Sequence, residues 1–142
     1  MKENGLELVL DMFRKYPMQY IGLVGLDGKP KVKPFEFKIE RDGKLYFDVL
    51  KSQETYREIE NNPYVEVTVA NKEKAEWIRL SGKVRFVLDP SLRRSLIAAS
   101  PILRSVCESD DDENVVPFTL DEVKVDIASL DKSRERICFS LA

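Results

Sequence analysis

Short segments in which apolar and polar residues alternate recur along most of this chain, and two Asp-Gly pairs separate the first of them. The clearest alternation runs from Ala75 to Leu88. A period of two puts successive side chains on opposite faces of a strand, so one face of this segment is expected to be buried. Asp27-Gly28 and Asp42-Gly43 are typical of tight hairpin turns. Many short strands with few helices predict a mainly β protein with flanking helices, an antiparallel barrel or sandwich and not a sheet of βαβ units.

The other elements follow from the same kind of evidence. Apolar residues at helical spacing predict a helix over 3–16, which Pro17 ends. Ser52 is expected to be the N-cap of a short second helix, and Asp89 the N-cap of a third that begins at Pro90. The first three expected strands form a meander, and the strands are expected at 18–26, 30–40, 44–50, 64–70, 75–88 and 115–130. The buried face of the fifth strand is expected to carry Ile78, Leu80, Val84, Phe86 and Leu88.

Composition excludes several kinds of chemistry. The 142 residues fit a single domain over 1–142, without a repeat or a linker. The absence of histidine excludes Ser-His-Asp and Cys-His catalysis, histidine-ligated haem and histidine zinc sites. Cys107 and Cys138 are too few for a disulfide framework, and no metal site is expected. A net charge of −2, no long apolar run and no apolar signal core predict a cytoplasmic protein with no nucleic-acid and no membrane partner.

A row of lysines lies in and beside the second expected strand. Lys29, Lys31 and Lys33 share one side of an extended segment. Such a row can hold a phosphate, because a cation and free strand amides bind an anion together. The simpler alternative is an edge strand that its lysines and Pro34 protect from aggregation, and the pattern alone favours this alternative.

Two further groups of residues could contact a ligand. Lys51-Ser52-Gln53 lies between a strand end and a helix start, where backbone amides favour anions, although a capped helix after a strand is common. Trp77 and Arg79 share the face opposite the apolar side chains of their strand. A tryptophan left in water is unfavourable, so this face is expected to meet a partner subunit, a flat aromatic ligand or the N-terminal helix. A cation–π pair at the surface is the alternative.

Five short motifs follow one another between about residues 18 and 88. They are, in order, Asp27-Gly28-Lys29-Pro30, Lys33-Pro34-Phe35, Leu45-Tyr46-Phe47, Tyr56 to Asn62-Pro63, and Trp77-Ile78-Arg79-Leu80-Ser81-Gly82. In this order they resemble the FMN-binding split barrel of the pyridoxamine 5'-phosphate oxidase-like superfamily, which includes nitroimidazole-resistance-type proteins. The resemblance implies a six-stranded antiparallel split β-barrel with flanking helices, as one FMN-binding domain.

The resemblance also implies a homodimer that binds FMN and a small-molecule substrate in clefts between its subunits. Lys33 would approach the FMN phosphate, and the backbone of Pro34-Phe35-Glu36 would run along the isoalloxazine ring. The segment from Asp48 to Gln53 would hold the ribityl-phosphate end, while Trp77 and Arg79 would lie at the cleft or the interface. The implied FMN-binding residues are Lys33, Pro34, Phe35, Glu36, Asp48, Val49, Lys51, Ser52, Gln53, Trp77 and Arg79. The flavin would carry the redox chemistry, and no catalytic side chain is assigned.

The segment 48–54 departs from the pattern of the superfamily and leaves two functions open. Val49 stands where many relatives carry Thr, and Gln53, followed by Glu54, stands where they carry a phosphate-binding Lys or Arg. Each lost charged hydrogen bond weakens binding by roughly 1–3 kcal/mol, which Lys51 could partly offset. One function is an FMN-dependent oxidoreductase that reduces a small acceptor. The other is a non-catalytic ligand-binding or stress-related dimer with weakened or lost FMN binding. A barrel that binds nucleic acid through the lysine row is disfavoured by the acidic balance.

Overall fold

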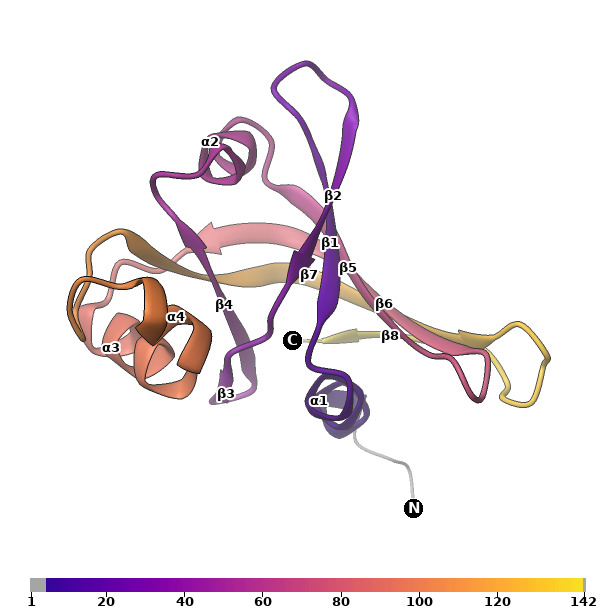
Figure 1. The fold of residues 1–142 in the computed structure, drawn as a ribbon. Helices are drawn as coiled ribbons and strands as arrows, with labels where there is room; N and C mark the ends of the chain where they lie inside the picture. The colour runs from indigo at the N-terminus through magenta and orange to yellow at the C-terminus, as the bar shows by residue number, and fades with distance from the viewer. Residues whose placement is uncertain (1–4, 142) are drawn as a thin grey trace.

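The computed structural model describes residues 5–141, in which a strongly curved antiparallel sheet is flanked by four helices (Figure 1). The strands are β1 (Gln19–Val24), β2 (Pro30–Phe35), β3 (Ile39–Arg41), β4 (Lys44–Leu50), β5 (Tyr64–Asn71), β6 (Glu76–Phe86), β7 (Val115–Ser129) and β8 (Ile137–Leu141). The helices are α1 (Gly5–Lys15), α2 (Glu54–Asn61), α3 (Pro90–Ala99) and α4 (Pro101–Val106). The first two residues of the helix predicted over 3–16, and both ends of the predicted domain 1–142, lie outside the described residues.

The order of strands confirms the predicted fold class. Neighbours in the sheet follow the order β2-β1-β5-β6-β7-β4-β3, with β8 paired to β7, and every pair is antiparallel. Over residues 5–141 this sheet has eight strands, where the resemblance implied six. The short strands β3 and β8 account for the difference, since β3 arises where the segment 30–40 divides and β8 is the last apolar run of the chain.

The predicted meander of the first three strands is wrong. β2 pairs with β1 at one edge of the sheet, whereas β3 pairs with β4 at the other edge. Residues 36–38 cross between these edges: the Phe37 amide donates to Oε1 of Gln19 at 2.6 Å, and the Lys38 amide donates to the carbonyl of Tyr46 at 3.1 Å. A two-residue period shows which face of a strand is buried but not which strand lies beside it, so the crossing was not visible in the pattern.

A cluster of phenylalanines holds the two edges of the sheet together. Phe47 of β4 is fully buried, and its ring centroid lies 5.0 Å from that of Phe35 and 5.7 Å from that of Phe37. Phe118 of β7 lies 5.5 Å from Phe47, and Phe13 of α1 lies 6.5 Å from it. Ring pairs at these separations stabilise a core beyond the area they bury. Phe35 at the end of β2 and Phe37 in the crossing therefore both pack on β4, near the other edge of the sheet.

The helix starts agree with the sequence in one case and differ in another. Asp89 caps α3 as predicted, since its side chain accepts a hydrogen bond from the Ser91 amide at 2.9 Å. Ser52 is not the N-cap of α2: the cap is Gln53, which makes no side-chain capping bond. The Ser52 hydroxyl instead accepts a hydrogen bond from Asn114 at 3.1 Å, so a contact with a distant loop takes the place of the local one.

The buried face of β6 ends earlier than predicted. Ile78, Leu80 and Val84 are buried as expected. Leu88 is 84% exposed, because β6 ends at Phe86 and the alternation of the strand no longer applies beyond it. Within residues 5–141, no helix combines the length and the apolar character that a membrane span requires.

Candidate ligand-binding cleft

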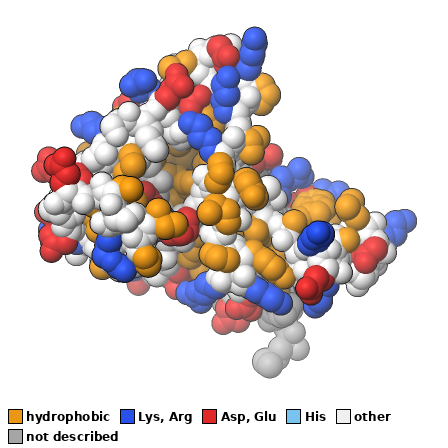
Figure 2. All heavy atoms as spheres, in the orientation of Figure 1, with side chains coloured by type: hydrophobic (Ala, Val, Ile, Leu, Met, Phe, Trp, Pro, Cys, Tyr) orange, Lys and Arg blue, Asp and Glu red, His pale blue; other side chains and the backbone are white. Residues whose placement is uncertain are grey.

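A cleft of about 320 Å³ opens where the two edges of the sheet approach each other. Its walls come from the end of β2, the end of β4, the start of α2 and one side of α4. In Figure 2, hydrophobic side chains gather around a hollow between the α3–α4 side of the molecule and the β1–β2 hairpin. Seven of the residues implied by the resemblance line this cleft: Lys33, Pro34, Phe35, Glu36, Asp48, Val49 and Gln53.

One side of the cleft is apolar. Val49, Ile59 and Leu103 are buried, and each lines the cleft. Ile102 and Val106 of α4 also line it, although both side chains are more than half exposed. Large apolar side chains at the rim of a cavity are typical of a surface that a ligand or another protein covers. This side suits a flat, apolar ring.

The polar part of the cleft contains a buried ionic network centred on Lys38. Its side chain is 7% exposed, and its ammonium lies 2.8 Å from Glu36 and 3.3 Å from Asp48. The Ser100 hydroxyl, fully buried between α3 and α4, donates to Glu36 at 3.1 Å. Burial raises the pKa of the Asp48 carboxyl above its usual value, while the neighbouring Lys38 acts in the opposite direction. The network has two carboxyl groups for one ammonium.

The side chain of Lys33, which lines the cleft from β2, reaches the first turns of α2. Its ammonium donates a hydrogen bond to the Thr55 hydroxyl and lies 3.4 Å from the Glu58 carboxylate. Glu58 is 2% exposed, whereas the Lys33 side chain is 39% exposed. A buried carboxylate needs a cation or hydrogen-bond donors nearby, and Lys33 meets this need. Lys33 is therefore the counter-ion of Glu58 in this structure.

Lys51 and Ser52 lie beside the cleft but do not line it. The Lys51 amide donates to the carbonyl of Asn114 at 2.7 Å, and the Ser52 amide donates to the Asn114 side chain at 2.9 Å. These contacts fix the turn after β4 against the loop that precedes β7. Of the predicted Lys51-Ser52-Gln53 segment, only Gln53 is brought to the cavity.

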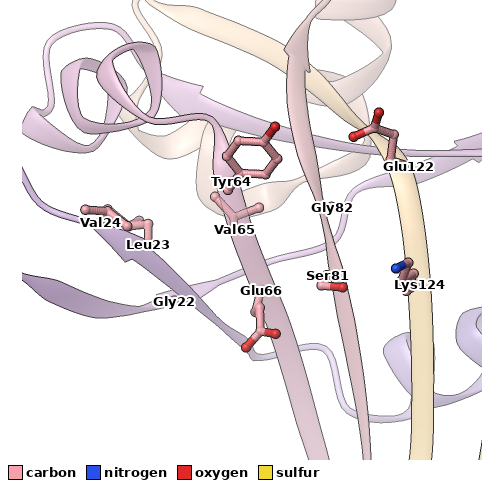
Figure 3. A pocket seen from close by; sticks show the side chains of 10 residues that line it. All are labelled: Gly22, Leu23, Val24, Tyr64, Val65, Glu66, Ser81, Gly82, Glu122 and Lys124. Carbon is pink, nitrogen blue, oxygen red and sulfur yellow. The ribbon is translucent and has the colours of Figure 1, made fainter.

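Trp77 and Arg79 lie on the central strand β6, away from the cleft. Arg79 pairs with Asp126 of β7 at 3.0 Å, and its guanidinium lies 5.5 Å from the centre of the Trp77 ring. The cation–π alternative is therefore present in the structure. Two shallow hollows lie on this part of the sheet, and Figure 3 shows the larger one, which spans β1, β5, β6 and β7 and includes Tyr64, Glu66 and Lys124. Among the described residues 5–141, neither Trp77 nor Arg79 is one of those that line the cleft.

Several residues of the cleft were not predicted from the sequence. Lys38, Thr55 and Leu103 line the cavity, and Glu58 and Ser100 support it from behind. Lys38 is the next lysine in the sequence after the predicted Lys33, five positions further on, and this proximity was a weak signal for it. Ser100 lies 64 positions from the Glu36 that it contacts, and no local pattern could connect the two.

The cleft fits the two ends of a flavin nucleotide unequally. Its apolar side fits a planar ring, as described above. Its two lysines are each paired with carboxylates, Lys33 with Glu58 and Lys38 with Glu36 and Asp48. A phosphate would have to compete with these carboxylates for the same ammonium groups. The residues that line the cleft therefore offer a site for a ring but no unpaired cation for a phosphate.

The curved sheet, with a cleft where its two edges meet, is the architecture of a split β-barrel. The family model described as pyridoxamine 5'-phosphate oxidase matches residues 7–126, and the chain belongs to this family. The family assignment that the five motifs implied is thereby confirmed.

Solved structures agree with this assignment. A NimC/NimA family protein from Clostridium acetobutylicum is 28% identical, with a TM-score of 0.84 over 96% of this chain and 92% of that one. General Stress Protein 26 from Bacillus anthracis is 21% identical, with a TM-score of 0.72 over 94% and 98% of the two chains. A pyridoxamine 5'-phosphate oxidase-related, FMN binding protein from Nostoc punctiforme is 12% identical, with a TM-score of 0.67 over the whole of both chains. The last two show the fold alone. No curated protein sequence matches this chain.

Proposed function

We propose that this protein binds a flavin in the cleft between β2, β4, α2 and α4 and reduces a small, aromatic or nitro-containing acceptor. The observation that carries the proposal is the cleft itself, which gathers seven residues implied by the FMN-binding resemblance around an apolar surface. Membership in the pyridoxamine 5'-phosphate oxidase family supports it, as does the likeness in fold to the FMN binding protein from Nostoc punctiforme. The resemblance of the five motifs to the FMN-binding split barrel implies that this flavin is FMN. When bound, the flavin would supply the electron transfer.

In this proposal, the residues of the chain position the ring and keep water away from it. Phe35 and Val49 would hold the ring, together with Pro34 and Glu36, which line the same cleft. The carboxyl of Asp48, whose pKa burial raises, lines the cleft beside Lys38 and takes up a proton more readily than an exposed aspartate does. Lys33 and Gln53 would hold the ribityl part, with Lys51 and Ser52 on the neighbouring turn.

The absorption spectrum and a flavin titration test the flavin part of the proposal. The purified protein is expected to show a flavin band, or to gain one after addition of FMN or riboflavin. A saturating flavin is expected to raise the free energy of unfolding by about 2.7 kcal/mol at a concentration of 100 Kd. Oxidation of a reduced nicotinamide in the presence of a nitroaromatic acceptor then tests the reductase part. A colourless protein whose thermal midpoint does not respond to either flavin would contradict the proposal.

We propose further that the working protein is a homodimer, in which Trp77 and Arg79 of one subunit approach the cleft of the other. Tyr20 and Tyr64 are large side chains about half exposed on the sheet, and Val32 is exposed on β2. Exposed apolar groups on neighbouring strands favour a subunit interface. A cleft of about 320 Å³ is also small for a ligand site, so a second chain would complete it.

Sedimentation velocity tests the dimer. The expected species at micromolar protein has twice the 16.4 kDa mass of the chain. A species with the mass of one chain at all accessible concentrations would show that Trp77 and Arg79 do not reach a cleft through a partner.

The pairing of both cleft lysines favours a second candidate function. A barrel that has lost phosphate contacts can still bind a planar ligand without catalysing a reaction. Such a protein would be a non-catalytic ligand-binding or stress-related dimer. Titration with FMN, haem and related planar cofactors separates the two candidates. Saturable binding without any nicotinamide-dependent reduction of an acceptor would favour the second.

A further inference from the structure

The polar part of the cleft has more carboxylates than ammonium groups. Glu36, Asp48 and Glu58 stand against Lys33 and Lys38, and each lysine lies within 3.4 Å of at least one of these carboxylates. Lys38 is shared by two of the three and is itself almost fully buried. The charge of Lys38 is therefore balanced by Glu36 and Asp48. Among the residues that line the cleft, Lys33 is the other cation.

Lys33 cannot leave Glu58 without a penalty. The Glu58 carboxylate is 2% exposed, and Lys33 is the cation that the structure places beside it. Removal of one partner from a buried ion pair is strongly unfavourable, because the other charge stays buried and uncompensated. A phosphate that drew the ammonium toward itself would impose this same penalty on Glu58. If the phosphate instead approached the intact pair, it would meet a lysine whose charge is already neutralised at short range.

We propose that Glu58, by holding Lys33, prevents the cleft from gaining affinity from a phosphate monoester. The ligand class is then a planar ring that binds through its ring and the uncharged part of its side chain, and the phosphate of FMN adds no affinity over riboflavin. This inference rests on the proposed binding of a flavin ring, but the behaviour of the phosphate is measured separately from it. It concerns only the end of the cleft at α2, where Lys33, Thr55 and Gln53 meet.

The first test compares riboflavin with FMN by fluorescence titration of the full chain at low salt. The wild-type protein is expected to bind the two with equal affinity. Glu58→Gln frees the Lys33 ammonium and is expected to strengthen FMN binding about tenfold while leaving riboflavin binding unchanged. Glu60→Gln removes the same charge from an exposed position of α2 and is the matched control, expected to change neither affinity. FMN binding at least tenfold tighter than riboflavin binding in the wild type would overturn the inference.

A double variant covers the case in which Glu58→Gln does not fold. Lys33→Met with Glu58→Met replaces the pair by apolar side chains of similar volume and keeps the net charge, a change that buried ion pairs often tolerate. If Glu58 already cancels Lys33, this variant binds FMN and riboflavin as the wild type does. A tenfold selective loss of FMN affinity would show that Lys33 serves the phosphate, and the inference would be wrong.

A titration with inorganic phosphate tests the role of Glu58 independently of flavin binding. In a titration followed by the amide resonances of residues 53–55, the wild type is expected to show no saturable shift, and Glu58→Gln is expected to show one. Absence of riboflavin binding to the wild type would refute the flavin proposal, yet these phosphate shifts would still decide the role of Glu58. A saturable shift in the wild type would overturn the inference whatever the flavins do.

Discussion

Replacement of Phe47 by alanine is expected to lower the free energy of unfolding by about 3–5 kcal/mol. The Phe47 side chain is fully buried and contacts the rings of Phe35 and Phe37, at the end of β2 and just after it, and of Phe118 in β7. Its removal leaves a cavity at the place where the two edges of the sheet meet, and the surrounding rings can fill such a cavity only in part. Chemical denaturation followed by circular dichroism measures the loss.

Leu88→Ala is the control for the Phe47 variant. Leu88 is also a large apolar side chain, but it is 84% exposed and lies outside the strands. Its truncation is expected to change the free energy of unfolding by no more than about 0.5 kcal/mol. Equal losses in the two variants would contradict the phenylalanine cluster as the main contact between the edges.

Replacement of Lys38 by methionine is expected to destabilise the protein by about 3–5 kcal/mol near neutral pH. Methionine preserves most of the volume of the side chain, so the loss comes from the charge. Glu36 and Asp48 would face each other without the ammonium that lies 2.8 and 3.3 Å from them. Thermal denaturation at several pH values measures the effect, and a variant as stable as the wild type at neutral pH would show that the network needs no cation.

The pH dependence of this loss has a definite sign. The pKa of Asp48 is raised by burial, so its carboxyl takes up a proton more readily in the folded chain than in the unfolded one. The stability linked to that proton is fully present below the usual pKa of an aspartate and is lost as pH rises through the raised value. In Lys38→Met the ammonium that lowers the pKa of Asp48 is gone, so the pKa is raised further and the variant gains more stability from protonation than the wild type does; its deficit is expected to shrink on acidification. Asp48→Asn is the control: it removes the titrating group, so its stability relative to the wild type is expected to fall as the pH is lowered and Asp48 of the wild type takes up its proton.

Local features of the fold could be predicted because the residues that decide them are neighbours in the sequence. Gly28 has a φ of +78° at the tip of the β1–β2 hairpin, where the Asp-Gly pair placed a turn. Val65, Val67 and Val69 are buried along β5, as their alternation required. Gly82 ends the Trp-Ile-Arg motif for a reason of packing, since a Cβ atom there would lie 3.1 Å from the carbonyl oxygen of Asp121.

The cleft could be predicted only where a motif ran along one strand. Lys33 to Glu36 are consecutive, and the structure brings them to the cavity together with Asp48, Val49 and Gln53. The partners that determine their charge come from elsewhere: Glu58 lies 25 positions from Lys33, and Ser100 lies 64 positions from Glu36. The pairing of each lysine with its carboxylate depends on tertiary contacts. The alternation of apolar and polar residues in the sequence carries no information about such contacts. Trp77 and Arg79 were grouped with the cleft only because their motif belongs to the ordered set that resembles the superfamily.

The passage of the chain over residues 36–38 ties access to the cleft to the integrity of the whole barrel. These residues form a bridge, with Phe37 bonded to β1 through Gln19 and Lys38 bonded to β4 through Tyr46. Glu36 and Lys38 in the same bridge also carry the ionic network of the cleft. Widening of the cleft thus requires the contacts of residues 36–38 with β1 and β4 to loosen. A ligand that fills the cleft is therefore expected to hold these two parts of the sheet together.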